Sequence, residues 1–528
     1  MNIQKNNVYL AMQGAVILTI AGLVTKILSA AYRVPYQNIV GDIGFYIYQQ
    51  VYPFYGMSVI LATSGFPVII SKVMLDHSYE KPYHIRSKVM TVSVLYLLVI
   101  GLLTFFPLFS YSVQIANHMG DSHLASLIKV TSFSFLLIPF VSIIRGFFQS
   151  EQNMSPTAVS QVIEQGIRVS LILATSYFML RMGFDLYATG IGALLSSIVG
   201  SVAAFIFLLV LWYKKSQQLN IGWNLTAPIR SISIVRSLVK YSITIGLSSL
   251  LLIFIQLIDA LNLYSLLVST GMDETLAKKT KGIYDRGQPL IQLGTVVATS
   301  LALSLVPVLA NAKAKKDNEF IQEQLELSLK LCIVIAGGAA AGLMAIMKPT
   351  NIMLFTNEAG TNVLIVLSFS VLFTSLALTQ FAILQGLGYT FFPAVSVLLG
   401  VGIKYLSNVW LIPEMGVSGA AFSTVVAYGV VVVMTLIYML SKGYHFPAFK
   451  HLLKVVISIL VMVLCLSGIL QIIESYFSFD NRLFATLISL AGVVIGGSVY
   501  GMMILKLNVF TKTELVNIPI INKAIKLK

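Results

Sequence analysis

The sequence contains few charged residues for its length. Only 10% of its 528 residues are charged, whereas 57% are hydrophobic. Soluble domains carry about 25% charged residues, and a soluble chain of this length would need polar surface for several domains. The composition therefore excludes a soluble enzyme, a disordered chain and a coiled coil. It predicts an all-α polytopic membrane protein, because helices satisfy their own backbone hydrogen bonds in lipid.

Cysteines and catalytic motifs are also scarce. The two cysteines, Cys332 and Cys465, lie in separate apolar runs, which excludes a disulfide framework and a Cys-x-x-Cys metal site. None of the six histidines begins a metal-binding motif, and there is no P-loop, His-Glu-x-x-His or Gly-x-Ser-x-Gly motif. No segment between the apolar runs is long enough to fold as a catalytic domain. We therefore expect no metal centre, no resident cofactor and no enzymatic activity.

What the sequence does contain is a series of long apolar runs. A transmembrane helix needs about 20 mostly apolar residues, and fourteen runs approach this length. They cover residues 9–34, 45–70, 89–109, 124–148, 158–180, 186–212, 234–259, 290–310, 329–347, 363–384, 394–411, 417–440, 452–473 and 483–505. The predicted organisation is an N-terminal lobe (1–215), a C-terminal lobe (230–443), two appended helices (450–506) and a basic tail (507–528).

The distribution of lysine and arginine predicts the orientation. The net charge is +15, and most of the basic residues fall in alternate loops and in the tail after Leu505. This is the positive-inside pattern of membrane proteins, so we expect both termini in the cytoplasm and no nucleic-acid binding. The tail either lies on the anionic inner leaflet or is a solvated end. Residues 271–286 break the pattern, which indicates either a miscounted helix or a basic vestibule on the outer side.

Two halves of the chain resemble each other. The matching segments are 44–50 with 282–288, 149–168 with 385–404, and 192–197 with 419–424. The second match pairs Arg168 with Lys404. Three matches in the same order indicate an internal duplication. Since each repeat contains six predicted helices, both start on the same side of the membrane. Parallel repeats of this kind are typical of transporters whose binding site lies between two rocking lobes.

Two cations lie on one face of the first predicted helix. Lys26 is near its middle and Arg33 follows seven residues later, so both side chains point in nearly the same direction, about 10 Å apart. Gln37 extends this face by one turn. A charge at the bilayer centre costs at least about 2.5–3.5 kcal/mol and needs a partner or water. We interpret the stripe as an anion-binding site; the alternative for Arg33 is an extended side chain that reaches the outer interface.

Asp259 and Gln256 lie near the end of the seventh predicted helix. The Asp259 carboxylate suits three roles: a counter-ion for a transported cation, a proton carrier, or a partner of Lys26 or Arg33.

Two further charged positions have structural and functional interpretations. Glu164 and Arg168 are four residues apart on the fifth predicted helix, which predicts an ion pair. Arg286 lies in a segment interrupted by glycine and proline, which indicates irregular backbone beside a cavity or a solvated loop.

Four segments resemble those of a known family. They are GFPVIISK at 65–72, RGFFQSEQNMSPTAVSQVIEQ at 145–165, DRGQPLIQLGTVVATSLALSLVP at 285–307 and LQGLG at 384–388. The chain resembles the polysaccharide biosynthesis exporters of the multidrug/oligosaccharidyl-lipid/polysaccharide superfamily, and within it the stage V sporulation protein B group and the MurJ-type lipid II flippases. The resemblance implies a fourteen-helix, two-lobe fold that exports or flips a lipid-linked saccharide at a bacterial plasma membrane.

The resemblance also bears on the site. MurJ-type proteins line a central cavity with arginines on their first, second and eighth helices. Lys26 and Arg33 correspond in kind to the first helix, and Arg286 to the eighth. The second predicted helix, at 45–70, has no arginine. This difference leaves lipid II and other undecaprenyl-linked glycans open as substrates.

The expected function is therefore a flippase for an undecaprenyl pyrophosphate-linked saccharide, with Lys26 and Arg33 binding the pyrophosphate between the lobes. Expected partners are this substrate, membrane lipids and enzymes of cell-envelope biosynthesis. The expected energy source is a proton gradient, a sodium gradient or the membrane potential. The alternatives are a cation-coupled multidrug antiporter, which needs acidic residues in its cavity, a membrane glycan polymerase and a non-transporting scaffold.

Overall fold

The computed structural model describes residues 17–18, 20–78, 83–219, 230–477, 479, 481–511 and 514. These residues form helices joined by short turns, and they include no strand. The all-α polytopic fold expected from the composition is confirmed. The predicted start of the first helix at residue 9 and most of the basic tail lie outside the described residues.

The chain divides into two compact units. The first comprises Met1–Pro289 and Thr390–Ala427, and the second comprises Leu290–Tyr389 and Tyr428–Lys528. The lobe boundaries derived from the repeat, at 1–215, 230–443 and 450–506, stay a prediction.

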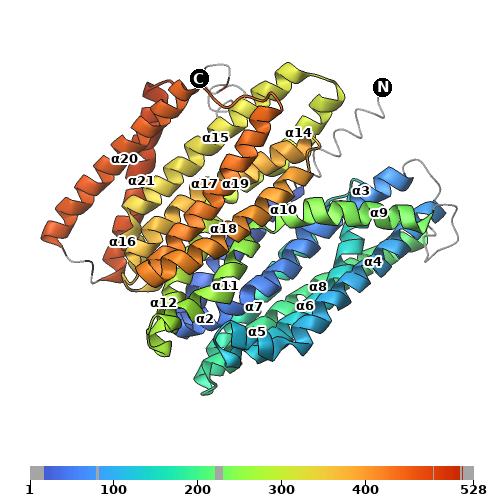
Figure 1. Ribbon diagram of the computed structural model, residues 1–528, viewed down its shortest axis with the longest axis horizontal. Coiled ribbons are helices and arrows are strands. Elements are labelled where there is room, and N and C mark those ends of the chain that lie inside the picture. Colours follow the sequence, from blue (N-terminus) through green and yellow to red (C-terminus); the bar gives the residue numbers. More distant parts are fainter. Residues whose placement is uncertain are drawn as a thin grey trace. The chain divides into compact units, whose positions relative to one another are not determined.

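The first unit contains the N-terminal helices and one pair from later in the chain. Its elements are α2 (Arg33–Ile60), η1 (Leu61–Gly65), α3 (Phe66–Ser78), α4 (Tyr83–Ser110), α5 (Ser112–His118), η2 (Ser122–Leu124), α6 (Ala125–Ser150), α7 (Ser155–Arg181), α8 (Leu186–Leu219), α9 (Ser231–Tyr241), η3 (Ser242–Gly246), α10 (Leu247–Ser249), α11 (Leu251–Ser269), α12 (Glu274–Asp285), the start of α13 (Gly287–Gly294), α18 (Phe391–Met415) and the first part of α19 (Val417–Ser441). Within it, α4 packs on α6, and α7 packs on α8 (Figure 1).

The second unit contains the remaining helices. They are the rest of α13, α14 (Val296–Ala314), α15 (Asn318–Ala345), α16 (Met347–Phe355), α17 (Thr361–Gly386), the rest of α19, α20 (Phe449–Tyr476) and α21 (Arg482–Lys506). Helices α20 and α21 pack together as a long pair (Figure 1). Only 17% of an 18-residue apolar stretch in each helix is buried. Leucines such as Leu464 and Leu487 are exposed. Such surfaces suit contact with lipid.

Within the residues that the structure describes, eleven helical segments are long and apolar enough to cross a membrane. The first runs from Ile20 to His77 and contains a break at Gly41, where φ is +70°. Helix α7 has 27 residues but is too polar to be among these eleven segments. The chain is a multi-pass membrane protein, and the count of fourteen helices stays a prediction.

Several segments expected to be loops are helical. Residues 271–286 contain α12, and the expected loop at 110–123 contains α5 and η2. The seventh predicted helix is divided by η3 and α10, and α11 continues to Ser269. Asp259 therefore lies in the middle of a helix and not near its end. Short polar helices lack the long apolar runs by which membrane spans are recognised, which explains why the composition missed them.

Candidate functional site

Arg33 is a buried cation without an acidic partner. Its side chain is fully buried at the start of α2, and the guanidinium lies 4.3 Å from the centre of the Tyr52 ring. None of its three nitrogens has an acceptor in hydrogen-bond geometry within the described residues, although the Tyr32 and Tyr48 side chains are neighbours. A buried cation in this state has lost its hydration without a compensating charge.

Arg168 of α7 lies in the same surroundings. Its Nη2 donates hydrogen bonds to the hydroxyl groups of Tyr32 (2.8 Å) and Tyr48 (3.2 Å), and its Nη1 donates to Oε1 of Gln165 (3.1 Å). The guanidinium also lies 5.8 Å from the centre of the Tyr52 ring. It is buried, and no carboxylate of the described chain forms an ion pair with it.

The local sequence explains how the tyrosines surround these two cations. Tyr48, Tyr52 and Tyr55 are spaced at i, i+4 and i+7 on α2, so they share one helix face. The break at Gly41 changes the direction of the chain, and the preceding turn brings Tyr32 and Tyr36 against Tyr48. The Tyr32 and Tyr48 hydroxyl groups are 2.9 Å apart. We call Arg33, Arg168 and these five tyrosines the arginine–tyrosine cluster.

The cluster carries two positive charges and no negative charge. By contrast, each of the four buried carboxylates in the described residues forms an ion pair. The pairs are Asp121 with Lys278, Glu164 with Arg145, Asp259 with Lys404, and Asp285 with Lys281. Two neighbouring guanidinium groups without acidic partners repel each other, and an anion placed between them would remove this repulsion. Guanidinium groups bind phosphate oxygens in bidentate geometry. The cluster is therefore a candidate anion site.

Arg286 and Gln37 are brought together, but by an acid. Nη2 of Arg286 lies 2.7 Å from Oδ1 of Asp42, and Nε2 of Gln37 donates to the same oxygen at 2.9 Å. Asp42 directly follows the break at Gly41. A Cβ atom on Gly282 would lie 2.0 Å from the Asp42 carbonyl oxygen, so glycine is required for α12 to approach α2 here.

The basic segment 278–286 is largely neutralised. Lys278 lies 3.2 Å from Asp121, Lys281 lies 2.7 Å from Asp285, and Arg286 pairs with Asp42. Lys279 is exposed. The expected irregular loop is a regular helix whose cations mostly face carboxylates.

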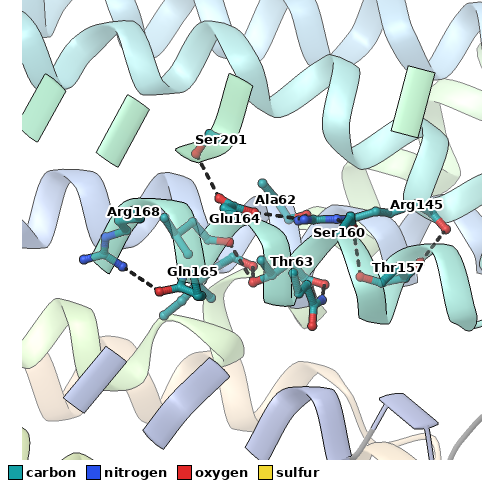
Figure 2. Close-up of polar contacts among 12 residues, drawn as sticks. Ala62, Thr63, Arg145, Thr157, Ser160, Glu164, Gln165, Arg168 and Ser201 are labelled. Carbon is teal, nitrogen blue, oxygen red and sulfur yellow. Dashed lines mark hydrogen bonds and ion pairs between the residues drawn. The ribbon is translucent and has the colours of Figure 1, made fainter. Parts of the chain in front are cut away.

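The expected pair of Glu164 and Arg168 has to be corrected. Glu164 accepts a 2.9 Å hydrogen bond from Nη2 of Arg145 on α6, and its other oxygen accepts from Ser201 of α8 at 2.8 Å. Figure 2 shows the Arg168 guanidinium directed away from Glu164. The donors to Glu164 therefore come from two neighbouring helices, α6 and α8, and not from its own helix.

Arg145 was not among the residues selected from the sequence. Its Nη1 donates to the carbonyl oxygen of Ala62 in η1 at 3.0 Å, and Gln161 donates to the next carbonyl, that of Thr63, at 3.5 Å (Figure 2). Pro67 follows and has no N–H to offer these carbonyls. Arg145 and Gln161 therefore satisfy backbone groups that the proline leaves free. In the sequence, Pro67 indicates that a carbonyl group about one helical turn earlier needs a donor from elsewhere.

Asp259 pairs with neither Lys26 nor Arg33. Its Oδ1 lies 2.6 Å from Nζ of Lys404, and its Oδ2 accepts from the Tyr284 hydroxyl at 2.7 Å. Gln256 is buried on the same helix and is not among these partners. Lys26 is half-buried, and no ion pair involving it forms among the described residues.

The comparisons with known proteins identify the family. The sequence profile described as polysaccharide biosynthesis protein matches residues 11–313, which is more than half of the chain. The chain belongs to this polysaccharide biosynthesis family. A relative named "Uncharacterized membrane protein YabM" from Bacillus subtilis (strain 168) is 46% identical over 97% of this chain and 96% of its own length.

Two further relatives of this chain are also from Bacillus subtilis (strain 168). "Lipid II flippase MurJ" is 25% identical and covers 93% of this chain and 94% of its own length. "Stage V sporulation protein B" is 26% identical and covers 97% and 98%. The resemblance inferred from the four sequence segments is confirmed.

Solved structures show the same fold. A lipid II flippase MurJ in an inward closed conformation aligns with a TM-score of 0.67 at 16% identity, over 95% of this chain and 99% of that chain. An inward-facing multidrug resistance MATE family transporter of the MOP superfamily aligns with a TM-score of 0.64 at 15% identity, over 81% and 98%.

Proposed function

We propose that this protein moves a lipid-linked saccharide across the bacterial plasma membrane, and that the arginine–tyrosine cluster binds the pyrophosphate of the carrier. The observation that supports this most strongly is the pair of buried guanidinium groups without acidic partners. A pyrophosphate supplies the missing negative charge and enough oxygens for both arginines. The full-length relative named as a lipid II flippase supports the substrate class.

In this proposal the other predicted residues act along the path of the headgroup. Lys26 attracts the anion on the cytoplasmic side of Arg33. Arg286 and Gln37 bind Asp42 in the present state, and they become available when the helices that carry them separate. No resident cofactor and no catalysis are required. Both termini lie in the cytoplasm, and a proton or sodium gradient or the membrane potential drives the cycle.

A multidrug antiporter of the same fold is less well supported. Such a protein needs a carboxylate that faces a cationic drug, yet each of the four buried carboxylates in the described residues is already paired with a base. A cationic drug would also be repelled by Arg33 and Arg168.

The experiment is transport in proteoliposomes. Purified protein is reconstituted with an undecaprenyl pyrophosphate-linked saccharide, and translocation is followed by the exposure of the sugar to a membrane-impermeant glycosidase. We expect Arg33→Met and Arg168→Met to reduce translocation at least tenfold. Lys129→Met, at an exposed cation outside the cluster, serves as the matched control. Translocation at the wild-type rate by both arginine variants would contradict the site, and absence of translocation by the wild type with any such saccharide would contradict the function.

A further inference from the structure

Lys404 is the partner of Arg168 in the internal repeat, but its surroundings are different. Both residues are buried cations on corresponding helices, α18 and α7. Arg168 faces tyrosine hydroxyls and no acid. Lys404 faces Asp259, which neutralises it. Of these two cations, which align in the sequence match, one has no acidic partner and the other is bound to a carboxylate.

Three oxygens surround the Lys404 ammonium group. Nζ lies 2.6 Å from Oδ1 of Asp259, 2.7 Å from Oγ1 of Thr424 and 2.9 Å from the carbonyl oxygen of Ala420. An ammonium group has three N–H donors, and each has an acceptor here. Lys404, Asp259 and Thr424 are at most 1% exposed. The oxygens come from α11 and α19, whereas the ammonium comes from α18.

Further contacts hold these oxygens in place without contributing charge. Oδ2 of Asp259 accepts from the Tyr284 hydroxyl, which lies 2.9 Å from the Thr424 hydroxyl. Oδ1 of Asp259 also accepts from the Asn408 amide at 3.0 Å. We call the three oxygens around Nζ of Lys404, from Asp259, Thr424 and Ala420, the cage. The cage is therefore positioned by groups other than Lys404.

The chemistry of this cage is that of a binding site for a monovalent cation. A carboxylate, a hydroxyl and a carbonyl are hard oxygen ligands, which hold hard cations. The cage has one formal negative charge, so one positive charge neutralises it, whereas a divalent ion would leave a buried excess charge. We infer that the Lys404 ammonium group is a tethered substitute for a small monovalent cation such as sodium. This inference does not depend on the identity of the transported molecule.

Two consequences follow from a tethered cation. The wild-type protein needs no exchangeable sodium ion at Asp259, so this carboxylate does not couple transport to a sodium gradient. Shortening Lys404 to alanine leaves a buried carboxylate and a space of the size of an aminopropyl group. That space should accept sodium, or methylammonium as the detached head of the missing side chain.

The test is thermal unfolding of purified protein in detergent, followed by intrinsic fluorescence. Wild type, Lys404→Ala and the double variant Asp259→Asn/Lys404→Ala are compared in sodium, methylammonium and N-methylglucamine chlorides at equal ionic strength. N-methylglucamine is too large for the cage and controls for ionic strength. A cation that binds the folded state raises the unfolding midpoint progressively with its concentration.

We expect the wild-type midpoint to be the same in the three salts. Lys404→Ala should have a low midpoint in N-methylglucamine and a higher, concentration-dependent midpoint in sodium or methylammonium. The double variant, whose cage is uncharged, should respond to neither. A sodium-dependent wild-type midpoint would overturn the inference. So would a folded Lys404→Ala that ignores both small cations, or one that fails to fold in either of them while the double variant folds.

Discussion

The guanidinium groups of Arg33 and Arg168 share one neighbour, the ring of Tyr52, and lie 4.3 and 5.8 Å from its centre. Two buried like charges without a counter-ion destabilise the fold. Arg33→Met should therefore raise the thermal midpoint while it reduces transport. We expect a gain in stability of about 1–3 kcal/mol, because the cost of the desolvated charge exceeds the value of the lost cation–π contact. The measurement is thermal unfolding beside the proteoliposome assay. A Met variant that is less stable than the wild type would show that Arg33 is structural.

Arg145 provides the opposite case, because it is a buried arginine with an acidic partner. Arg145→Met leaves Glu164 uncompensated and the Ala62 carbonyl without its donor. We expect a loss of about 3–5 kcal/mol, the range measured when one member of a buried pair is removed. The double variant Arg145→Met/Glu164→Gln should recover a large part of this loss, since no charge then remains unpaired. Additive losses in a double-mutant cycle would contradict the pairing.

Gly282 should tolerate no side chain. Its Cβ position lies 2.0 Å from the Asp42 carbonyl oxygen, so Gly282→Ala must separate α12 from α2 and weaken the pair of Arg286 and Asp42. We expect a loss of about 1–3 kcal/mol or more in thermal stability. Gly166→Ala on α7 is the matched control, because nothing lies within 4 Å of its Cβ position. There the substitution should be neutral or stabilising. Equal effects at the two positions would refute the close approach.

Glu514 should stabilise the fold only while it is ionised. Burial alone would raise its pKa, but hydrogen bonds from the Thr511 backbone and from Lys330 outweigh burial and lower the pKa below its usual value. A carboxylate with a lowered pKa stabilises the fold above the ordinary pKa, and this contribution is lost as the pH falls through the lowered value. Glu514→Gln should therefore be less stable than the wild type at pH 7.

The pH dependence of that difference is the test. Thermal midpoints of wild type and Glu514→Gln should converge as the pH falls below the ordinary range for glutamate, about pH 4. Lys330→Gln should reproduce the loss at pH 7, because it removes the same ion pair. A difference that persists unchanged into acid would mean that the carboxylate charge is not responsible.

Some parts of the site followed from the sequence and others did not. The position of Arg33 in a long apolar run could be read from the sequence, and its side chain is buried in the structure. The tyrosine face of α2 also follows from the i, i+4, i+7 spacing of Tyr48, Tyr52 and Tyr55. The partners of Glu164, Arg286 and Asp259 were not predictable, since each is supplied by a residue of another helix.

The amino-acid sequence by itself determined that the protein is helical, lies in a membrane and carries cations deep in its apolar segments. These properties depend on composition and on periodicity along one helix, and both are local. The tertiary structure alone decided which of those cations are neutralised. A helix can turn a charge toward any of several neighbours, and the energy of a buried charge depends on which neighbour it meets within a few ångströms. Arg33 and Arg168 contact tyrosines, whereas Arg145 and Lys404 contact carboxylates.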